Sequence, residues 1–208
     1  MSKTFAYVVA AVVCIGIGAL VAGLCVYYAH PDLVTSQQSS ESRYARCVLQ
    51  DTPVGGAVTG TLTLEQLRPT SPVLINGVIY GLTEGLHGFH VHEWGVDGSE
   101  NNCTDAGGHY NPMGNKHSAP NATERHVGDL GNVRSVQLDA FGRTATNTSI
   151  VDNVLSLWGQ YSIVGRAIVV HAGEDDLGLG KNDGSLKTGN AGGRVACCTI
   201  YLTSKPAN

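Results

Sequence analysis

Six of the eight histidines in this chain fall in four short segments of its C-terminal two thirds. Neutral imidazole is the commonest protein ligand for zinc and copper, and a carboxylate, Asp129, follows His126 by three residues. A fold that brings these side chains together has to be built around bound metal, so the histidines restrict the architecture more than the composition does. The six are His90, His92, His109, His117, His126 and His171.

These residues fill two sets of four ligands if one histidine belongs to both. His90 and His92 are two residues apart in a predicted strand, so their side chains lie on the same face. Three histidines with one carboxylate leave no open position, which is typical of structural zinc, whereas nitrogen ligands alone suit copper. Scattered surface histidines, the alternative, would not cluster in this way. We call His109, His117, His126 and Asp129 the mixed set, and His90, His92, His109 and His171 the nitrogen-only set.

Short segments rich in Val, Ile, Thr and Tyr, separated by glycine-rich turns, predict about eight strands and no helix in residues 44–208. Residues 58–64 alternate polar and apolar side chains, as a half-buried strand does. We therefore expect an all-β sandwich or barrel, comparable to an immunoglobulin-like sandwich. The predicted strands are 44–50, 57–64, 73–81, 88–93, 127–138, 143–149, 161–171 and 195–203.

Two glycine-rich stretches, residues 94–126 and 172–194, contain no predicted strand. Structureless loops of this length are uncommon in compact domains and are usually functional. Both contain or adjoin the histidines, and metal or a disulfide can order a loop that buries little apolar surface. We expect a rigid sandwich that carries two metal-stabilised loops.

The N-terminal segment differs from the rest, because residues 4–29 contain no charged side chain. About 20 such residues span a bilayer, whereas the apolar region of a secretory signal has only about 7–15. We predict a transmembrane signal anchor over residues 1–30, then a polar tether over residues 31–43 and one domain over residues 44–208. A cleaved signal is the alternative, and a buried core helix does not fit the absence of polar positions.

Charge and sequons indicate the orientation of this anchor. Lys3 precedes the apolar segment, which by the positive-inside tendency leaves the N-terminus in the cytosol and the domain outside it. Asn102, Asn121 and Asn147 begin Asn-x-Ser/Thr sequons, which favour a glycoprotein on the extracellular side.

The net charge is only -4 and no block of Lys or Arg exists, so we expect no nucleic-acid partner.

Three motifs resemble signatures of the copper,zinc superoxide dismutase family: residues 88–93, 125–132 and 189–197. The resemblance covers roughly Arg46 to Thr203. It implies a Greek-key β-barrel that dismutates superoxide to dioxygen and hydrogen peroxide. Copper would occupy the nitrogen-only set, zinc the mixed set, and His109 would bridge the two metals as imidazolate. A homodimer is also implied.

The resemblance assigns roles to further residues. Asp175 matches the carboxylate that links the copper ligand His90 to the zinc ligand His117 and fixes their ring orientation. Arg194 matches the cation that draws in and orients the superoxide anion. Cys103 and Cys197 match the disulfide of the family.

This sequence departs from the family pattern at two places. The family often carries two acids before the Ser-x-Lys-Thr motif, but here Gly184 follows Asp183, which alters the charge that guides substrate. The loop between His92 and Cys103 is about two residues longer than expected and holds Trp94, near the dimer contact of the family. The dimer is therefore predicted less firmly than the metal ligands.

Four cysteines lie outside the family disulfide. Cys14 and Cys25 fall in the apolar segment, where we expect them to serve packing. Cys47 and Cys198 lie in the two terminal predicted strands, and we expect two buried thiols, with a second disulfide as the alternative.

Two rival functions are a dismutase-like binding module that has lost copper ligands and a structural adhesion domain. A complete ligand set and Arg194 favour the enzyme.

Overall fold

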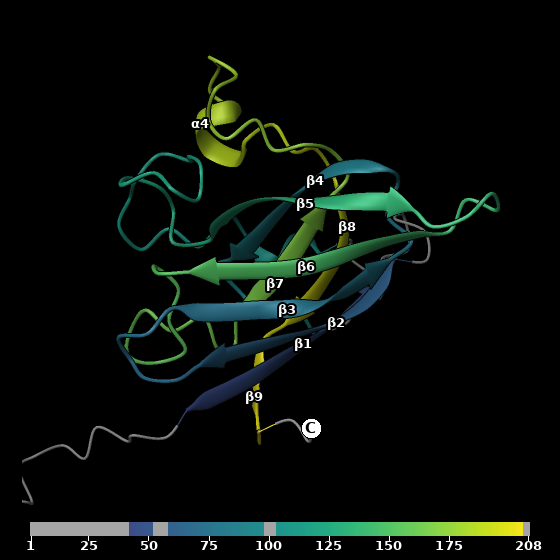
Figure 1. The fold of residues 1–208 in the computed structure, drawn as a ribbon. Helices are drawn as coiled ribbons and strands as arrows, with labels where there is room; N and C mark the ends of the chain where they lie inside the picture. Colours follow the sequence, from purple (N-terminus) through teal and green to yellow (C-terminus); the bar gives the residue numbers. More distant parts are fainter. Residues whose placement is uncertain (1–41, 52–57, 98–102, 206–208) are drawn as a thin grey trace, which may run out of the picture. The chain divides into compact units, whose positions relative to one another are not determined.

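Nine β-strands, one 3-10 turn and one four-residue helix make up the regular structure of residues 42–51, 58–97 and 103–205, which this computed structural model describes (Figure 1). The expected all-β class is confirmed. The elements are β1 (Arg43–Asp51), β2 (Thr59–Gln66), β3 (Val73–Tyr80), β4 (Gly85–His92), η2 (Thr104–Ala106), β5 (Asp129–Gln137), β6 (Thr144–Asp152), β7 (Ala167–His171), α4 (Ser185–Thr188), β8 (Arg194–Thr199) and β9 (Tyr201–Thr203).

All neighbouring strands are antiparallel and follow the order β2-β3-β6-β5-β4-β7-β8-β1-β9, and a further β1–β2 pairing closes the barrel. The β5–β6 and β1–β8 ladders have only two residue pairs each. These short seams divide the barrel into a sheet of β9, β1, β2, β3 and β6 and a sheet of β5, β4, β7 and β8. Strand β3 lies beside β6 and not beside β4, which is the Greek-key connection.

The expected count of eight strands is one too low, because the last predicted strand divides at Ile200. The preceding part, β8, pairs with β7 through Thr199 and Ala167, whereas β9 pairs with β1 through Tyr201 and Arg46. Ile200 is fully buried at the point where the chain passes from one sheet to the other.

The strand predicted over residues 161–171 begins only at Ala167. The preceding residues turn instead, with hydrogen bonds from Ser162 N to Gly159 O and from Arg166 N to Ile163 O. Gly159 and Gly165 both have positive φ, a backbone conformation that interrupts a strand.

The core lies between the two sheets and is filled by alternating positions of the strands. In β2 the side chains of Leu62 and Leu64 are at most 1% exposed, whereas Thr61 before them is exposed and Thr63 between them is half-buried. The predicted alternation over residues 58–64 is therefore confirmed.

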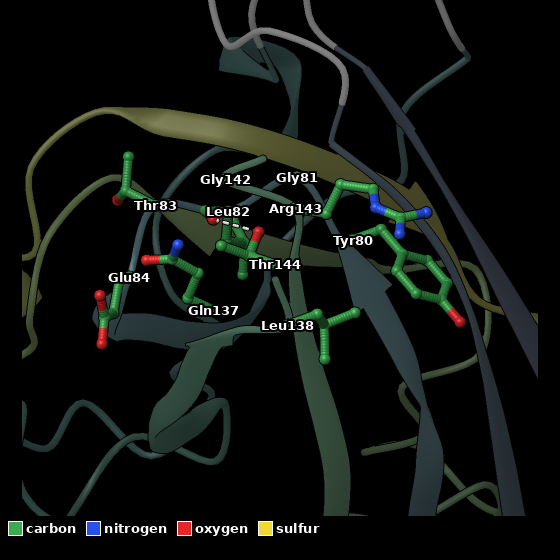
Figure 2. Close-up of a pocket in the computed structure, with 10 residues that line it drawn as sticks. All are labelled: Tyr80, Gly81, Leu82, Thr83, Glu84, Gln137, Leu138, Gly142, Arg143 and Thr144. Carbon is green, nitrogen blue, oxygen red and sulfur yellow. Dashed lines mark hydrogen bonds between the residues drawn. The ribbon is translucent and has the colours of Figure 1, made fainter. Parts of the chain in front are cut away.

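Leu82 follows β3 and lies near the end of β5 and the beginning of β6, among the residues that line a surface hollow (Figure 2). Its side chain is buried, and its carbonyl accepts a hydrogen bond from Thr144 Oγ1 at 2.6 Å. The hollow has a volume of about 520 Å³, and Tyr80 and Leu138 also line it. These two side chains are about half exposed, and none of the six predicted ligand histidines lines the hollow.

Two disulfides join β8 to other parts of the chain. Cys103–Cys197 is the pair that the family resemblance implied. Cys47–Cys198 connects β1 to β8 inside the core, so the expectation of two buried thiols is wrong. Because β1 and β8 share only two backbone pairs, this bond reinforces a weak seam of the barrel. No cysteine among the described residues is free.

None of the helices in the described ranges is long and apolar enough to cross a membrane. The predicted anchor and nearly all of the predicted tether fall outside those ranges. Arg43, which we placed at the end of the tether, is the first residue of β1.

Removing the second disulfide with the double variant Cys47→Ala, Cys198→Ala should lower the free energy of unfolding by about 4–5 kcal/mol, since the bond closes a long loop in the unfolded chain. Denaturant unfolding of both proteins without reductant measures the difference. A thiol reductant is the control, because it breaks the bond and should remove most of the difference in free energy of unfolding between the wild-type protein and the variant. Equal stability without reductant would show that the bond does not form.

Candidate metal centre

Strand β4 carries apolar and histidine side chains on opposite faces. Phe89 and Val91 are fully buried in the core, so His90 and His92 project from the other face of the sheet, where they too are buried. In the neighbouring strand β7, the register shifts by one residue next to His171 at the strand end. Three histidines from two paired strands therefore reach one region outside the barrel.

The loop after β4 returns to that strand and brings in a fourth ring. His109 forms a β-bridge with His92, and Tyr110 N donates to Val91 O at 2.9 Å. Gly128 follows the same strand so closely that an added Cβ would lie 2.0 Å from Val91 O. Only glycine permits this approach, which places the following Asp129 beside His90 in the β4–β5 ladder.

The rings of the mixed set converge on one carboxylate oxygen. The Nδ1 atoms of His109 and His117 lie 2.9 Å from Asp129 Oδ1, and Nδ1 of His126 lies 3.1 Å from it. Ligands of a tetrahedral zinc at about 2.0–2.1 Å are spaced roughly 3.3 Å apart. The donor spacing of the mixed set therefore approaches that of a closed zinc site.

The nitrogen-only set also has its ligand atoms together, within 4.8 Å of one another. Nε2 of His92 lies 3.3 Å from Nε2 of His171. The opposite nitrogens of these rings donate to backbone carbonyls, His92 Nδ1 to Gly107 at 3.0 Å and His171 Nδ1 to Gly192 at 3.2 Å. These hydrogen bonds fix the tautomer that leaves each Nε2 lone pair available to a metal.

Buried nitrogens without a protein partner test whether a metal fits. Within the described residues, His90 Nδ1, His109 Nε2 and His117 Nδ1 make no hydrogen bond although they are buried. His117 Nδ1 approaches Asp129 Oδ1 but lacks hydrogen-bond geometry. Buried polar atoms are normally satisfied, so these three nitrogens indicate places where a metal cation fits. His109 is the ring that offers one nitrogen to each set.

The carboxylate of Asp175 connects the two sets, because it accepts a hydrogen bond from one histidine of each. Its Oδ2 accepts from His90 Nε2 and its Oδ1 from His117 Nε2, both at 2.8 Å, and all these side chains are buried. The backbone around Asp175 is held by Asn132, whose side chain donates to its carbonyl and accepts from its N–H, each at 2.8 Å. The link that the family resemblance implied is present in the structure.

Burial and hydrogen bonding set the charges of the ligands. Burial lowers the pKa of His90 to about 3 and that of His171 to about 4, so these rings are neutral at pH 7, which is the form that binds metal. Burial would raise the pKa of Asp129, but its close contacts with the nitrogens of His109, His117 and His126 hold it well below its usual range.

His117 behaves differently from the other rings. Burial lowers its pKa, but the two carboxylates that it touches, Asp129 and Asp175, outweigh burial and raise the pKa to about 9. In the absence of metal this ring holds a proton between two carboxylates at pH 7, and metal binding has to displace that proton.

Arg194, the first residue of β8, is held by the loop that carries the family disulfide. Its Nη1 donates to Cys103 O at 2.6 Å and its Nη2 to Gly107 O at 2.5 Å. Gly107 O is also the acceptor for His92 Nδ1, so one carbonyl orients both the guanidinium and a ligand. Burial, followed by the charges of His109 and Arg194, lowers the pKa of His92.

Comparison with known proteins decides the family. Residues 58–200 match the family model described as copper/zinc superoxide dismutase. The chain belongs to the copper/zinc superoxide dismutase family. The protein called Superoxide dismutase (Cu-Zn) 4 of Dictyostelium discoideum is 50% identical over 153 residues, which cover 74% of this chain and 94% of that protein. Superoxide dismutase (Cu-Zn) 5 of the same organism is 47% identical over 159 residues, 76% of this chain and 97% of its own length.

Membership in the copper/zinc superoxide dismutase family makes this chain an enzyme that dismutates superoxide, with copper and zinc as its cofactors. The rival interpretation as a binding module without copper ligands does not fit, because all seven predicted ligands lie together as two complete sets. An adhesion domain would need neither set.

Sequence reasoning missed several contributors to this centre. His87 is not one of the six predicted ligands, but its Nδ1 lies 2.8 Å from the carbonyl of His171, a member of the nitrogen-only set. The carbonyls of Gly107 and Gly192 orient ligand rings, and backbone groups leave no signal in a sequence. Arg125 is the first residue of the motif at residues 125–132, but nothing in that motif predicted its contacts with the mixed set.

His109→Ala should weaken both sites together, because this ring is the one shared between the two sets. We expect an altered visible copper spectrum and faster zinc loss in the same protein. His87→Ala is the control, since His87 touches only the nitrogen-only side through His171 O, so zinc retention should stay near wild type. A His109 variant in which copper alone changes would contradict the shared position.

Proposed function

We propose that copper binds in the nitrogen-only set and zinc in the mixed set, with His109 shared between them. The observation that supports this assignment is the pair of nitrogens on His109: Nδ1 lies 2.9 Å from Asp129, and Nε2 is buried without a partner in the described residues. The mixed set includes a carboxylate and leaves no open position, as structural zinc requires, and the other set offers nitrogen alone.

Bound copper, which alternates between Cu(II) and Cu(I), supplies the electron transfer by which one superoxide is oxidised to dioxygen and a second, with two protons, is reduced to hydrogen peroxide. The residues of the chain bind, orient and protonate. His109 Nε2 has no hydrogen-bond partner among the described residues, so it can hold a proton near the peroxide product. Asp175 keeps His90 and His117 in fixed orientations while protons move.

Arg194 would bind the superoxide anion. Backbone carbonyls of the disulfide loop hold its guanidinium in place, so little side-chain freedom is lost when an anion binds. Its charge already acts on His92 and His171, two members of the nitrogen-only set. An anion drawn to Arg194 is therefore brought to the copper ligands.

Substrate guidance would differ from the usual family pattern at α4. Gly184 precedes this helix in place of a second acid, and Lys187 lies exposed in its last turn. Lys187 forms no ion pair with any carboxylate of the described ranges. Its positive charge is left to attract an anion without a neutralising partner.

We place the domain on the extracellular side of a membrane, anchored by residues 1–30 with the N-terminus in the cytosol; secretion after signal cleavage is the alternative. Asn121 and Asn147 are exposed, as glycosylation requires, and Asn102 lies outside the described residues. Two disulfides are also more typical of an oxidising compartment than of the cytosol.

A homodimer would use the surface around Trp94. This side chain is 59% exposed and, with Tyr161, borders a hollow of about 460 Å³ next to His109. A large exposed aromatic residue beside a hollow is typical of a surface that a partner covers.

The copper assignment and the role of Arg194 can be tested together. The wild-type protein should hold copper and zinc and dismutate superoxide, whereas Arg194→Ala should keep both metals and lose about tenfold or more in turnover. Inhibition by small anions should weaken in parallel. Arg194→Lys is the matched control, since it keeps the charge and should retain more activity than the alanine variant.

Two results would count against these assignments. A wild-type protein that contains zinc alone after copper loading would overturn the copper site. Unchanged anion inhibition in Arg194→Ala would overturn the role of Arg194 in substrate binding.

Protease added to intact cells should release an active fragment that begins within residues 31–42, because the tether is predicted to lie outside the cytosol. Glycosidase should lower the mass of that fragment, and the variant Asn121→Gln, Asn147→Gln should reduce this shift. A soluble protein that starts near residue 30 would support signal cleavage instead. An unglycosylated domain protected from external protease would contradict the topology.

A further inference from the structure

Arg125 is a buried cation that lies next to the mixed set without being one of its ligands. Its side chain is 2% exposed, although burial of an arginine is costly unless its donors are satisfied. It directly precedes the ligand His126 in the chain. Its contacts therefore show what the guanidinium contributes to this segment.

The segment that carries two ligands wraps around the guanidinium of Arg125. Its Nη1 donates to Asp129 O at 2.6 Å and lies 3.3 Å from the carbonyl oxygens of His126 and Val127. Three carbonyls of one turn therefore point toward a single positive charge. This arrangement fixes the backbone from which the imidazole of His126 and the carboxylate of Asp129 project.

The other end of the guanidinium is attached to the barrel. Nη2 of Arg125 donates to Asp152 Oδ2, and this ion pair is buried on both sides. Asp152 is itself immobilised, because its Oδ1 accepts the N–H groups of Val154 at 2.8 Å and Leu155 at 2.7 Å. It ends β6, where its backbone is paired with Val73 of β3. The loop segment is thus connected to β6, which belongs to the other sheet of the barrel.

We propose that Arg125, held by Asp152, is a positioning residue that sets how tightly the mixed set retains zinc. The inference rests on the proposed assignment of zinc to that set. Within the described residues, the side chain of Arg125 donates hydrogen bonds only to residues 126–129 and to Asp152, and His126 and Asp129 belong only to the mixed set. The effect is therefore expected on zinc and not on copper.

The geometry requires arginine and not merely a positive charge. The planar guanidinium reaches a carboxylate with one nitrogen and a row of carbonyls with another. The ammonium of lysine is a single point and cannot span both. Arg125→Lys should therefore act like a loss of the connection, although the charge is conserved.

Zinc release from the copper- and zinc-loaded full-length protein tests the proposal. Asp152→Asn keeps the size of the side chain but removes its charge, and Arg125→Lys removes the fork. Each should release zinc to a coloured chelator about 10–100-fold faster than the wild type, as loss of a partner behind a ligand usually does. The copper content and visible copper spectrum should stay near wild type.

A destabilised variant outside the zinc segment separates positioning from general stability. Cys47→Ala, Cys198→Ala serves this purpose, because the bond joins β1 to β8 and neither cysteine hydrogen-bonds to Arg125 or Asp152 within the described residues. Zinc release from Asp152→Asn at the rate of this control, or at the wild-type rate, would overturn the proposal. If Arg125→Lys does not fold, the near-isosteric Asp152→Asn alone decides. A wild-type protein that retains no zinc would overturn the zinc assignment as well.

Discussion

Strand β4 is the element on which the metal centre depends, because its two faces serve the core and the ligands at the same time. Phe89 and Val91 anchor it in the apolar interior, so the positions of His90 and His92 follow from packing. Both long loops are then attached to this strand by backbone hydrogen bonds. Val91 bonds to Tyr110 and Gly128, and Gly88 N donates to Gly173 O at 2.8 Å. The two loops also meet each other, since His117 N donates to Leu186 O at 2.9 Å, and α4 stands beyond the β4–β5 sheet in Figure 1.

The centre brings six imidazoles and two carboxylates into one buried cluster, which is unfavourable unless their charges are balanced. Most of the rings are kept neutral by burial, while Asp129 and Asp175 stay ionised because histidines donate to them. The proton on His117 partly balances these carboxylates without metal, and the metal cations would replace it. Because the loops bury few apolar side chains of their own, their order depends on these polar contacts.

The members of the two sets could be predicted to lie together because their types and spacing are unusual, and an i, i+2 pair on a strand has one geometric interpretation. The strands could be predicted where one face is buried, as in residues 58–64. Features that depend on register between distant segments could not. The pairing of Cys47 with Cys198 follows from the short β1–β8 seam, and the division at Ile200 from the passage between sheets. The carbonyl acceptors of Gly107 and Gly192 and the turn around Arg125 depend on backbone positions that side-chain patterns do not encode.

The adjacent residues Cys197 and Cys198 face opposite sides of β8 and are bonded to different partners. As a result, the chain from Cys47 to Cys198 forms a covalent ring with a second ring inside it. A single cut of the backbone anywhere between those two residues produces two pieces that remain linked. A cut before Cys47, by contrast, separates the N-terminal segment from the intact domain. A protease that cuts once before Cys47 would therefore release the intact domain. A protease that cuts once between Cys47 and Cys198 would leave both pieces of the domain covalently joined.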